Sequence, residues 1–177
     1  MYRIDTLLKQ EKKLFHTSDL ALLWQIQVPN TLYTTIKRYV QKGILKRIHK
    51  GFYSAIPIEK LDPLELGIGY LHSFAYLSTE SILQENGIIF QTSDYITLVS
   101  STSKKFMIGG HSFLVRKMKD EFLYQSAGLT ERDNIKVATL ERAVADILYF
   151  NPNFYFDNRK IINWLRVKEI QKEAFSL

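Results

Sequence analysis

The chain has 177 residues, with 24 Lys and Arg against 18 Asp and Glu, a net charge of +6, 46% hydrophobic residues and no cysteine. This length allows one or two domains, and the hydrophobic fraction excludes disorder as a description of the whole chain. Without cysteine there is neither a disulfide framework nor thiolate chemistry. No apolar run reaches the roughly 18 residues that a membrane span needs, and the N-terminus lacks the apolar region of a signal peptide, so we expect a soluble, cytoplasmic protein.

The excess positive charge is concentrated in one segment. Residues 20–58 contain no Asp or Glu, and their cations are Lys37, Arg38, Lys42, Lys46, Arg47 and Lys50. These six account for the whole net charge, so the rest of the chain is balanced. We expect this acid-free segment to bind a polyanion; the alternative is an ordinary solvated basic face on a helix and a hairpin.

Three helices are expected at the start of the chain. Apolar residues at helical spacing predict the first over residues 2–13, followed by an extended link at 15–16, and a second helix over 20–25. Pro29 then interrupts the pattern because proline biases the residue before it away from the helical region. The third helix is predicted over residues 31–42.

A basic hairpin is expected after these helices. Gly43 favours a helix end, and two β-like runs at 44–49 and 52–56 are separated by Lys50 and Gly51. Three helices with a tight turn before the third, followed by a basic hairpin, are the element order of a winged helix-turn-helix. We therefore assign residues 1–58 to a DNA-binding domain of this kind.

The third helix and the hairpin supply the candidate DNA contacts. Leu32, Ile36, Tyr39 and Val40 form the apolar stripe of the helix, which leaves a polar face for base edges and phosphates. The candidates are Asn30, Tyr33, Thr34, Lys37, Arg38, Gln41 and Lys42 on the helix, with Lys46, Arg47, His49 and Lys50 on the wing. Tyr33 is as well suited to supporting the core, and His49 to a hydrogen bond within its strand.

Residues 59–177 are predicted to form a second, α+β domain with a mostly antiparallel sheet. Two prolines and returning acids at 57–63 indicate the boundary. The short connections favour antiparallel pairing. The expected helices are 63–72, 79–86, 140–150 and 158–174, and the expected strands are 75–77, 95–101, 104–108, 112–117, 121–124 and 135–138.

No pattern in the chain indicates catalysis. The histidines lack metal-ligand spacing and no phosphate-binding glycine loop follows a strand, so we expect no enzyme, no catalytic residue, no metal site and no cofactor. Gly67-Ile68-Gly69 in a predicted helix favours close packing. Arg142 and Asp146, four residues apart, predict an ion pair on a helix surface or anchoring the domain.

Three segments resemble the AbiEi-type antitoxins, the transcriptional-regulator halves of abortive-infection toxin–antitoxin systems. The first is the wing, Lys42-Gly43-Ile44-Leu45-Lys46-Arg47-Ile48-His49-Lys50-Gly51-Phe52-Tyr53. The others are Ala75-Tyr76-Leu77-Ser78, ahead of a helix that ends at Asn86-Gly87, and Val137-Ala138-Thr139-Leu140-Glu141-Arg142-Ala143-Val144-Ala145-Asp146. The segments follow the family's order, and the resemblance as a whole covers about residues 18–148.

The resemblance implies an autorepressor that binds operator repeats through Lys37, Arg38, Lys46, Arg47 and Lys50. It also implies antitoxin action, of type IV, against a nucleotidyltransferase-like toxin, with or without a stable complex. The expected partners are thus operator DNA and, functionally, that toxin. The alternative is a protein-interaction module whose basic segment anchors RNA or DNA without sequence preference. A catalytic second domain is a minor alternative.

Overall fold

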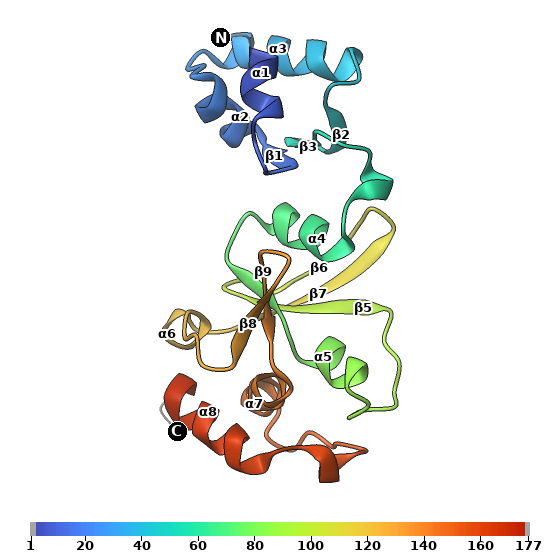
Figure 1. Cartoon of the computed structure of the whole chain (residues 1–177), viewed down its shortest axis with the longest axis vertical. Coiled ribbons are helices and arrows are strands. Elements are labelled where there is room, and N and C mark those ends of the chain that lie inside the picture. The colour runs from blue at the N-terminus through green and yellow to red at the C-terminus, as the bar shows by residue number, and fades with distance from the viewer. Residues whose placement is uncertain (1–2, 176–177) are drawn as a thin grey trace. The chain divides into compact units, whose positions relative to one another are not determined.

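The computed structural model describes residues 3–175, and the chain divides into two compact units, Met1–His72 and Ser73–Leu177. Both units combine helices with a β-sheet, which confirms the α+β class (Figure 1). Within residues 3–175 no helix is long and apolar enough to cross a membrane.

The first unit contains five α-helical or 3-10 segments and three short strands. In chain order these are α1 (Arg3–Leu8), β1 (Leu14–His16), α2 (Thr17–Trp24), α3 (Pro29–Gln41), β2 (Lys46–His49), β3 (Phe52–Ser54), the 3-10 helix η1 (Ile58–Lys60) and α4 (Pro63–Leu71).

The first helix is shorter than the sequence predicted, and position 2 lies outside the described residues. The predicted helix over 2–13 ends at Leu8, and the link expected at 15–16 belongs to strand β1. β1 pairs antiparallel with β3, Leu14 opposite Ser54, which gives a sheet in the order β1-β3-β2. Leu14 has the spacing of a helical residue relative to the leucines before it, but it belongs to strand β1, and its side chain is buried there.

A four-residue turn separates α2 from α3. Gln25 ends α2 in a left-handed conformation at φ 53°, and the backbone N–H of Ile26 donates to the Ala21 carbonyl at 3.0 Å. Val28 is extended, as expected before proline, and Pro29 occupies the first turn of α3, where its missing N–H costs nothing. Proline therefore starts the third helix two residues earlier than predicted.

The core of the first unit joins all three helices to the sheet. Leu32 and Ile36 on α3 are buried against Leu20 and Trp24 of α2, and Leu45 and Tyr53 close the cluster from the hairpin side. Tyr39 and Val40 pack against this cluster from its edge. The predicted inner stripe of α3 is thus the face that the structure buries.

The first unit continues past the predicted boundary at 58/59 and includes α4. A Cβ added at Gly69 would lie 2.9 Å from Leu14 Cδ1, so α4 approaches β1 closely. His16 stacks on His72 at 4.0 Å between ring centroids, and its Nε2 is 2.7 Å from the Gly69 carbonyl oxygen. These contacts fasten α4 to the first unit, which is why the prolines at 57–63 mark a turn inside it.

The second unit is built around a six-stranded mixed sheet. Its elements are β4 (Ala75–Leu77), α5 (Glu80–Glu85), β5 (Tyr95–Ser100), β6 (Lys104–Ile108), β7 (His111–Lys117), α6 (Asp120–Leu123), β8 (Leu129–Arg132), β9 (Ile135–Ala138), α7 (Leu140–Phe150), the 3-10 helix η2 (Arg159–Ile161) and α8 (Trp164–Phe175).

The strand order is β6-β7-β5-β4-β9-β8. The pairs β6–β7, β5–β4 and β9–β8 are antiparallel, whereas β5–β7 and β4–β9 are parallel. The connections are short, yet β5 and β7 pair in parallel, because β6 runs back along the sheet between them in the sequence. In Figure 1, α5 and α7 lie together beside the sheet, and α8 packs against α7.

Three element predictions in the second unit were wrong. A strand was expected at 121–124, but residues 121–123 belong to α6, in whose first turn Asp120 and Glu121 are favourable. The strand Leu129–Arg132 was missed, because its sequence, Leu-Thr-Glu-Arg, contains a single apolar residue and shows no alternation. The last helix begins at Trp164 instead of 158, since the Asn163 side chain accepts from the Arg166 N–H at 3.2 Å.

Candidate nucleic-acid interface

All eleven predicted DNA contacts are exposed to solvent. On α3 they form two rows at four-residue spacing, and such rows lie side by side on a helix. One row is Asn30, Thr34 and Arg38; the other is Tyr33, Lys37 and Gln41. The helix therefore buries its apolar stripe and presents a continuous polar face.

The six cations of the acid-free segment make no ion pair with any residue between 3 and 175. Lysines elsewhere in the same unit do pair: Lys12 lies 2.8 Å from Asp19, and Lys13 lies 3.9 Å from Glu65. Exposed charges of one sign without counter-charges produce a positive local potential. This face therefore carries positive charge that no described residue compensates.

A groove of about 360 Å³ lies between α3 and the hairpin. Tyr33, Lys37 and Gln41 form its α3 side, with Arg47 of β2 opposite. Tyr53, the partner of Arg47 in the β2–β3 ladder, also lines it. The structure thus brings one row of α3 together with the hairpin. The sequence prediction did not include Tyr53, whose position in a predicted strand was its only signal.

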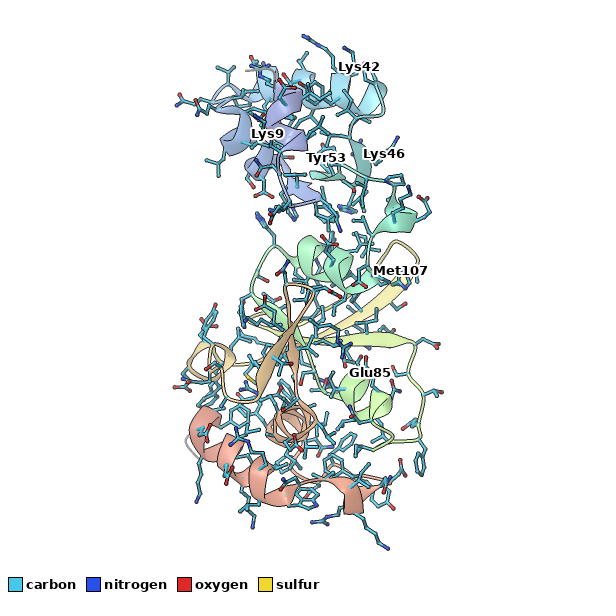
Figure 2. All side chains as sticks on the ribbon, in the orientation of Figure 1. Lys9, Lys42, Lys46, Tyr53, Glu85 and Met107 are labelled. Carbon is cyan, nitrogen blue, oxygen red and sulfur yellow. The ribbon has the colours of Figure 1, made fainter. Side chains whose placement is uncertain are left out.

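The helix and the wing are joined by a tight turn at Gly43, which has φ 69°. Figure 2 shows Lys42 at the end of α3 and Lys46 at the start of β2, on either side of this turn. A Cβ added at Gly43 would lie 3.3 Å from the Lys46 Nζ, so the Lys46 ammonium lies close to the turn. The Lys46 ammonium therefore lies beside the turn that ends α3.

The surroundings of three candidates define what each can offer a ligand. The Thr34 hydroxyl donates to the Asn30 carbonyl at 2.7 Å and keeps only its acceptor capacity for a ligand. The His49 ring packs edge-on against Tyr70 at 5.4 Å, with no ring hydrogen bond to the residues described. Tyr33 is 59% exposed and lines the groove, so it does not support the core.

Arg142 and Asp146 occupy the interior of the second unit. Both side chains are 0% exposed, so the helix-surface interpretation was wrong and the anchoring one describes the pair. Arg142 Nε donates to Asp146 at 2.8 Å, and the Ser78 hydroxyl donates to the same carboxylate at 2.6 Å. Burial raises the pKa of Asp146, although Arg142 and Ser78 act against that rise.

The remaining donors of Arg142 are also used. Its Nη atoms donate to the Tyr76 hydroxyl at 3.0 Å and to the carbonyls of Gln125 and Ala127 at 3.1 and 2.7 Å. The guanidinium also lies over the Phe175 ring, 5.2 Å from its centroid. Two of the three family-like segments thus meet in this network, where they fix helix α7 to the sheet.

No group of three or more His, Asp or Glu side chains placed to hold a metal ion occurs within residues 3–175. Comparison with protein-family models and with curated proteins found no match to this chain. The similarity of its segments to the AbiEi-type antitoxins therefore stays a prediction.

Proposed function

We propose that the first unit is a winged helix-turn-helix that binds duplex DNA. The observation that carries this proposal is the set of six exposed cations without counter-charges, all on α3, the turn and the hairpin. In this arrangement the outer face of α3 enters the major groove and Asn30, Tyr33, Lys37 and Arg38 meet base edges. Lys46, Arg47 and Lys50 on the wing contact phosphates.

The groove beside α3 supports this orientation. Lys37 of α3 and Arg47 of β2 both line it, and no acid does. A phosphate between the two cations would receive charge-assisted hydrogen bonds from both elements, which would fix the register of the helix on the duplex.

We further propose that the chain is a transcriptional autorepressor and the antitoxin of a toxin–antitoxin pair. This part rests on the resemblance of residues 42–53, 75–78 and 137–146 to the AbiEi-type antitoxins. The partner would be a nucleotidyltransferase-like toxin encoded beside it. Growth of cells that express the neighbouring open reading frame, with and without this chain, tests the antitoxin role; unchanged growth arrest would contradict it.

The DNA proposal is tested by mobility-shift titration on the DNA upstream of the gene. Changing Lys37→Ala together with Arg38→Ala should weaken binding at least tenfold and lower the slope of log K against log salt by about two units. Lys9→Ala with Lys60→Ala removes two exposed lysines of the same unit outside the acid-free segment and is the matched control. Unchanged affinity in the first variant would contradict the assignment of α3.

The same titration separates the proposal from its alternative. A specific repressor binds the upstream repeat at least about a thousandfold more tightly than scrambled DNA of equal length. A ratio near one would favour a nonspecific nucleic-acid anchor attached to an interaction module.

A further inference from the structure

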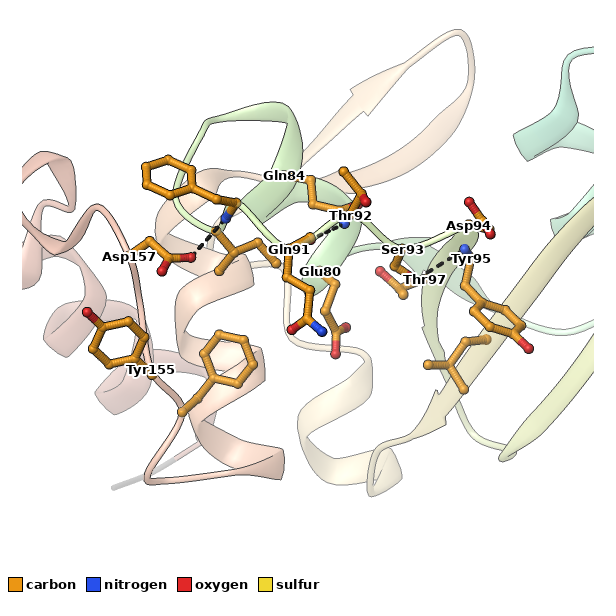
Figure 3. Close-up of a pocket in the computed structure, with 14 residues that line it drawn as sticks. Glu80, Gln84, Gln91, Thr92, Ser93, Asp94, Tyr95, Thr97, Tyr155 and Asp157 are labelled. Carbon is orange, nitrogen blue, oxygen red and sulfur yellow. Dashed lines mark hydrogen bonds between the residues drawn. The ribbon is translucent and has the colours of Figure 1, made fainter.

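The second unit contains a cavity of about 670 Å³, a size typical of ligand sites. It lies beside α5 and the start of β5, and two loops complete its rim (Figure 3). Part of the rim consists of aromatic and acidic side chains, namely Phe90, Asp94, Tyr95, Tyr155 and Asp157.

The two loops are fastened to one another, so the rim has a defined form. The Phe90 N–H donates to an Asp157 carboxylate oxygen at 2.8 Å, and the Asn158 N–H donates to the Ile88 carbonyl at 3.0 Å. Phe156 is buried and packs against Trp164 at 5.8 Å between ring centroids. The cavity is consequently present before any ligand arrives.

The rim exposes aromatic rings to an unusual degree. Phe90 is 71% and Tyr155 is 78% exposed, and no cation between residues 3 and 175 lies over either ring. At the other side of the rim, the Lys105 Nζ lies 5.4 Å from the centroid of Tyr95. Exposed aromatic side chains are enriched in protein interfaces and their faces attract cations.

The charge of the lining is negative. Glu80, Asp94 and Asp157 line the cavity, and Lys, Arg and His are absent from its lining among the described residues. Arg116 pairs with Glu80, and Asp94 and Asp157 have no ion-pair partner among the residues that the structure describes. In Figure 3, Tyr155 and Asp157 lie at one end and Asp94 and Tyr95 at the other, with Gln91 and Glu80 between them.

We propose that this cavity binds an arginine-bearing segment of a partner protein. A guanidinium stacks on an aromatic face while it donates to a carboxylate, and the end with Tyr155 and Asp157 offers that combination. At the other end Lys105 already lies over the Tyr95 ring, so Asp94 offers a carboxylate to a second cation there. Two acidic ends separated by polar side chains suit an extended polypeptide better than a single small amine. The site lies in the other unit from the DNA-binding surface and goes beyond the proposed function.

The test is a fluorescence-anisotropy titration of the full chain with a fluorescein-labelled peptide of glycine and serine that contains two arginines. We expect a Kd between about 10 μM and 1 mM, because exposed ion pairs and cation–π contacts are individually weak. The same peptide with citrulline in place of arginine keeps the shape and loses the charge, and it should bind at least fivefold more weakly.

Two variants locate the peptide in the cavity. Asp157→Asn removes the charge but keeps an oxygen that accepts from the Phe90 N–H, so the rim stays closed; affinity should fall about threefold. Tyr155→Ala removes an exposed ring and should cost a similar factor. Asp133→Asn, at an exposed turn outside the cavity with φ 50°, keeps a left-handed conformation that asparagine tolerates, and it should bind as the parent does.

Several results would overturn the proposal. These are the absence of binding at 1 mM, equal affinity for the arginine and citrulline peptides, or equal losses in Asp157→Asn and Asp133→Asn. Free arginine amide binding as tightly as the peptide would indicate a small-amine site. Self-association of the chain that Asp157→Asn abolishes, measured by sedimentation velocity, would place a second copy in the cavity. None of these outcomes bears on the proposal that the first unit binds DNA.

Discussion

Lys37 in the first unit and Arg142 in the second are both cations on helices, and their surroundings are opposite. Lys37 is exposed, faces a groove without an acid and has no ion-pair partner among the described residues. Arg142 is completely buried, and a carboxylate, a hydroxyl and backbone carbonyls accept hydrogen bonds from its guanidinium. A cation whose donors are all satisfied inside the fold serves stability, whereas one left without a counter-charge is available to a ligand.

The largest expected effect is on the buried cation. Arg142→Met leaves the Asp146 carboxylate buried without its partner, so the free energy of unfolding of the second unit should fall by about 3–5 kcal/mol. Urea denaturation followed by the fluorescence of Trp164, in a Trp24→Phe background, reports this unit alone, because the chain has only these two tryptophans.

Arg132→Met is the control for this change. Arg132 lies on the surface of the same unit, 3.6 Å from Glu85, and both side chains are about half exposed. Its loss should cost no more than about 1 kcal/mol. If the two variants are equally stable, the buried network does not anchor α7, and the contrast between the units is wrong.

A smaller effect is expected from pH on the first unit. Burial, with a contribution from His72, lowers the pKa of His16 below 6.5, although the Gly69 carbonyl and Asp19 act in the opposite sense and Lys12 assists. The unfolded state therefore takes up a proton before the folded state does as the pH falls. The contribution of His16 to the free energy of unfolding is therefore fully present above about pH 6.5 and is lost as the pH falls below that value.

The measurement compares urea denaturation at pH 7.5 and 5.5 by Trp24 fluorescence in a Trp164→Phe background. His16→Gln has an amide that can donate to Gly69 and does not titrate in this range, so part of the pH dependence should disappear. If the parent protein were more stable at pH 5.5 than at pH 7.5, and His16→Gln removed that difference, the lowered pKa of His16 would be contradicted.

The smallest effect on stability is expected from the wing. Arg47 is exposed and unpaired among the described residues, so Arg47→Ala should change the free energy of unfolding of the first unit by less than about 0.5 kcal/mol. On the proposed function, the same variant should weaken binding to upstream DNA several-fold and reduce the salt slope by about one unit. If Arg47→Ala lowered the free energy of unfolding as well as DNA affinity, exposed cations such as Arg47 could not be distinguished from structural ones such as Arg142.

The sequence predicted the first unit well where apolar spacing and proline act locally. The buried stripe of α3 and the hairpin follow from such signals, and so does the extended Val28. The strand Leu14–His16 and the inclusion of α4 depend on pairing with β3 and on the absence of a side chain at Gly69. Those contacts join residues far apart in the chain, and periodicity does not encode them.

The two candidate sites were predictable to different degrees. A segment without acids is visible in a one-dimensional sequence, so the basic face could be found before the fold was known. The aromatic and acidic rim of the cavity combines residues 80–97 with residues 154–157, which share no motif. Likewise, spacing alone placed Arg142 beside Asp146 but gave no information on burial, because the helix that carries them is covered by α8 and α6.

The six-stranded sheet of the second unit ends on β6 and β8, and neither strand has a partner on its outer side among the described strands. Such open edges invite pairing with other chains, and charged side chains discourage it. β6 begins with Lys104 and Lys105, and β8 ends with Glu131 and Arg132. The charged side chains of these two edge strands therefore oppose aggregation, so neutral substitutions there are expected to lower solubility more than stability.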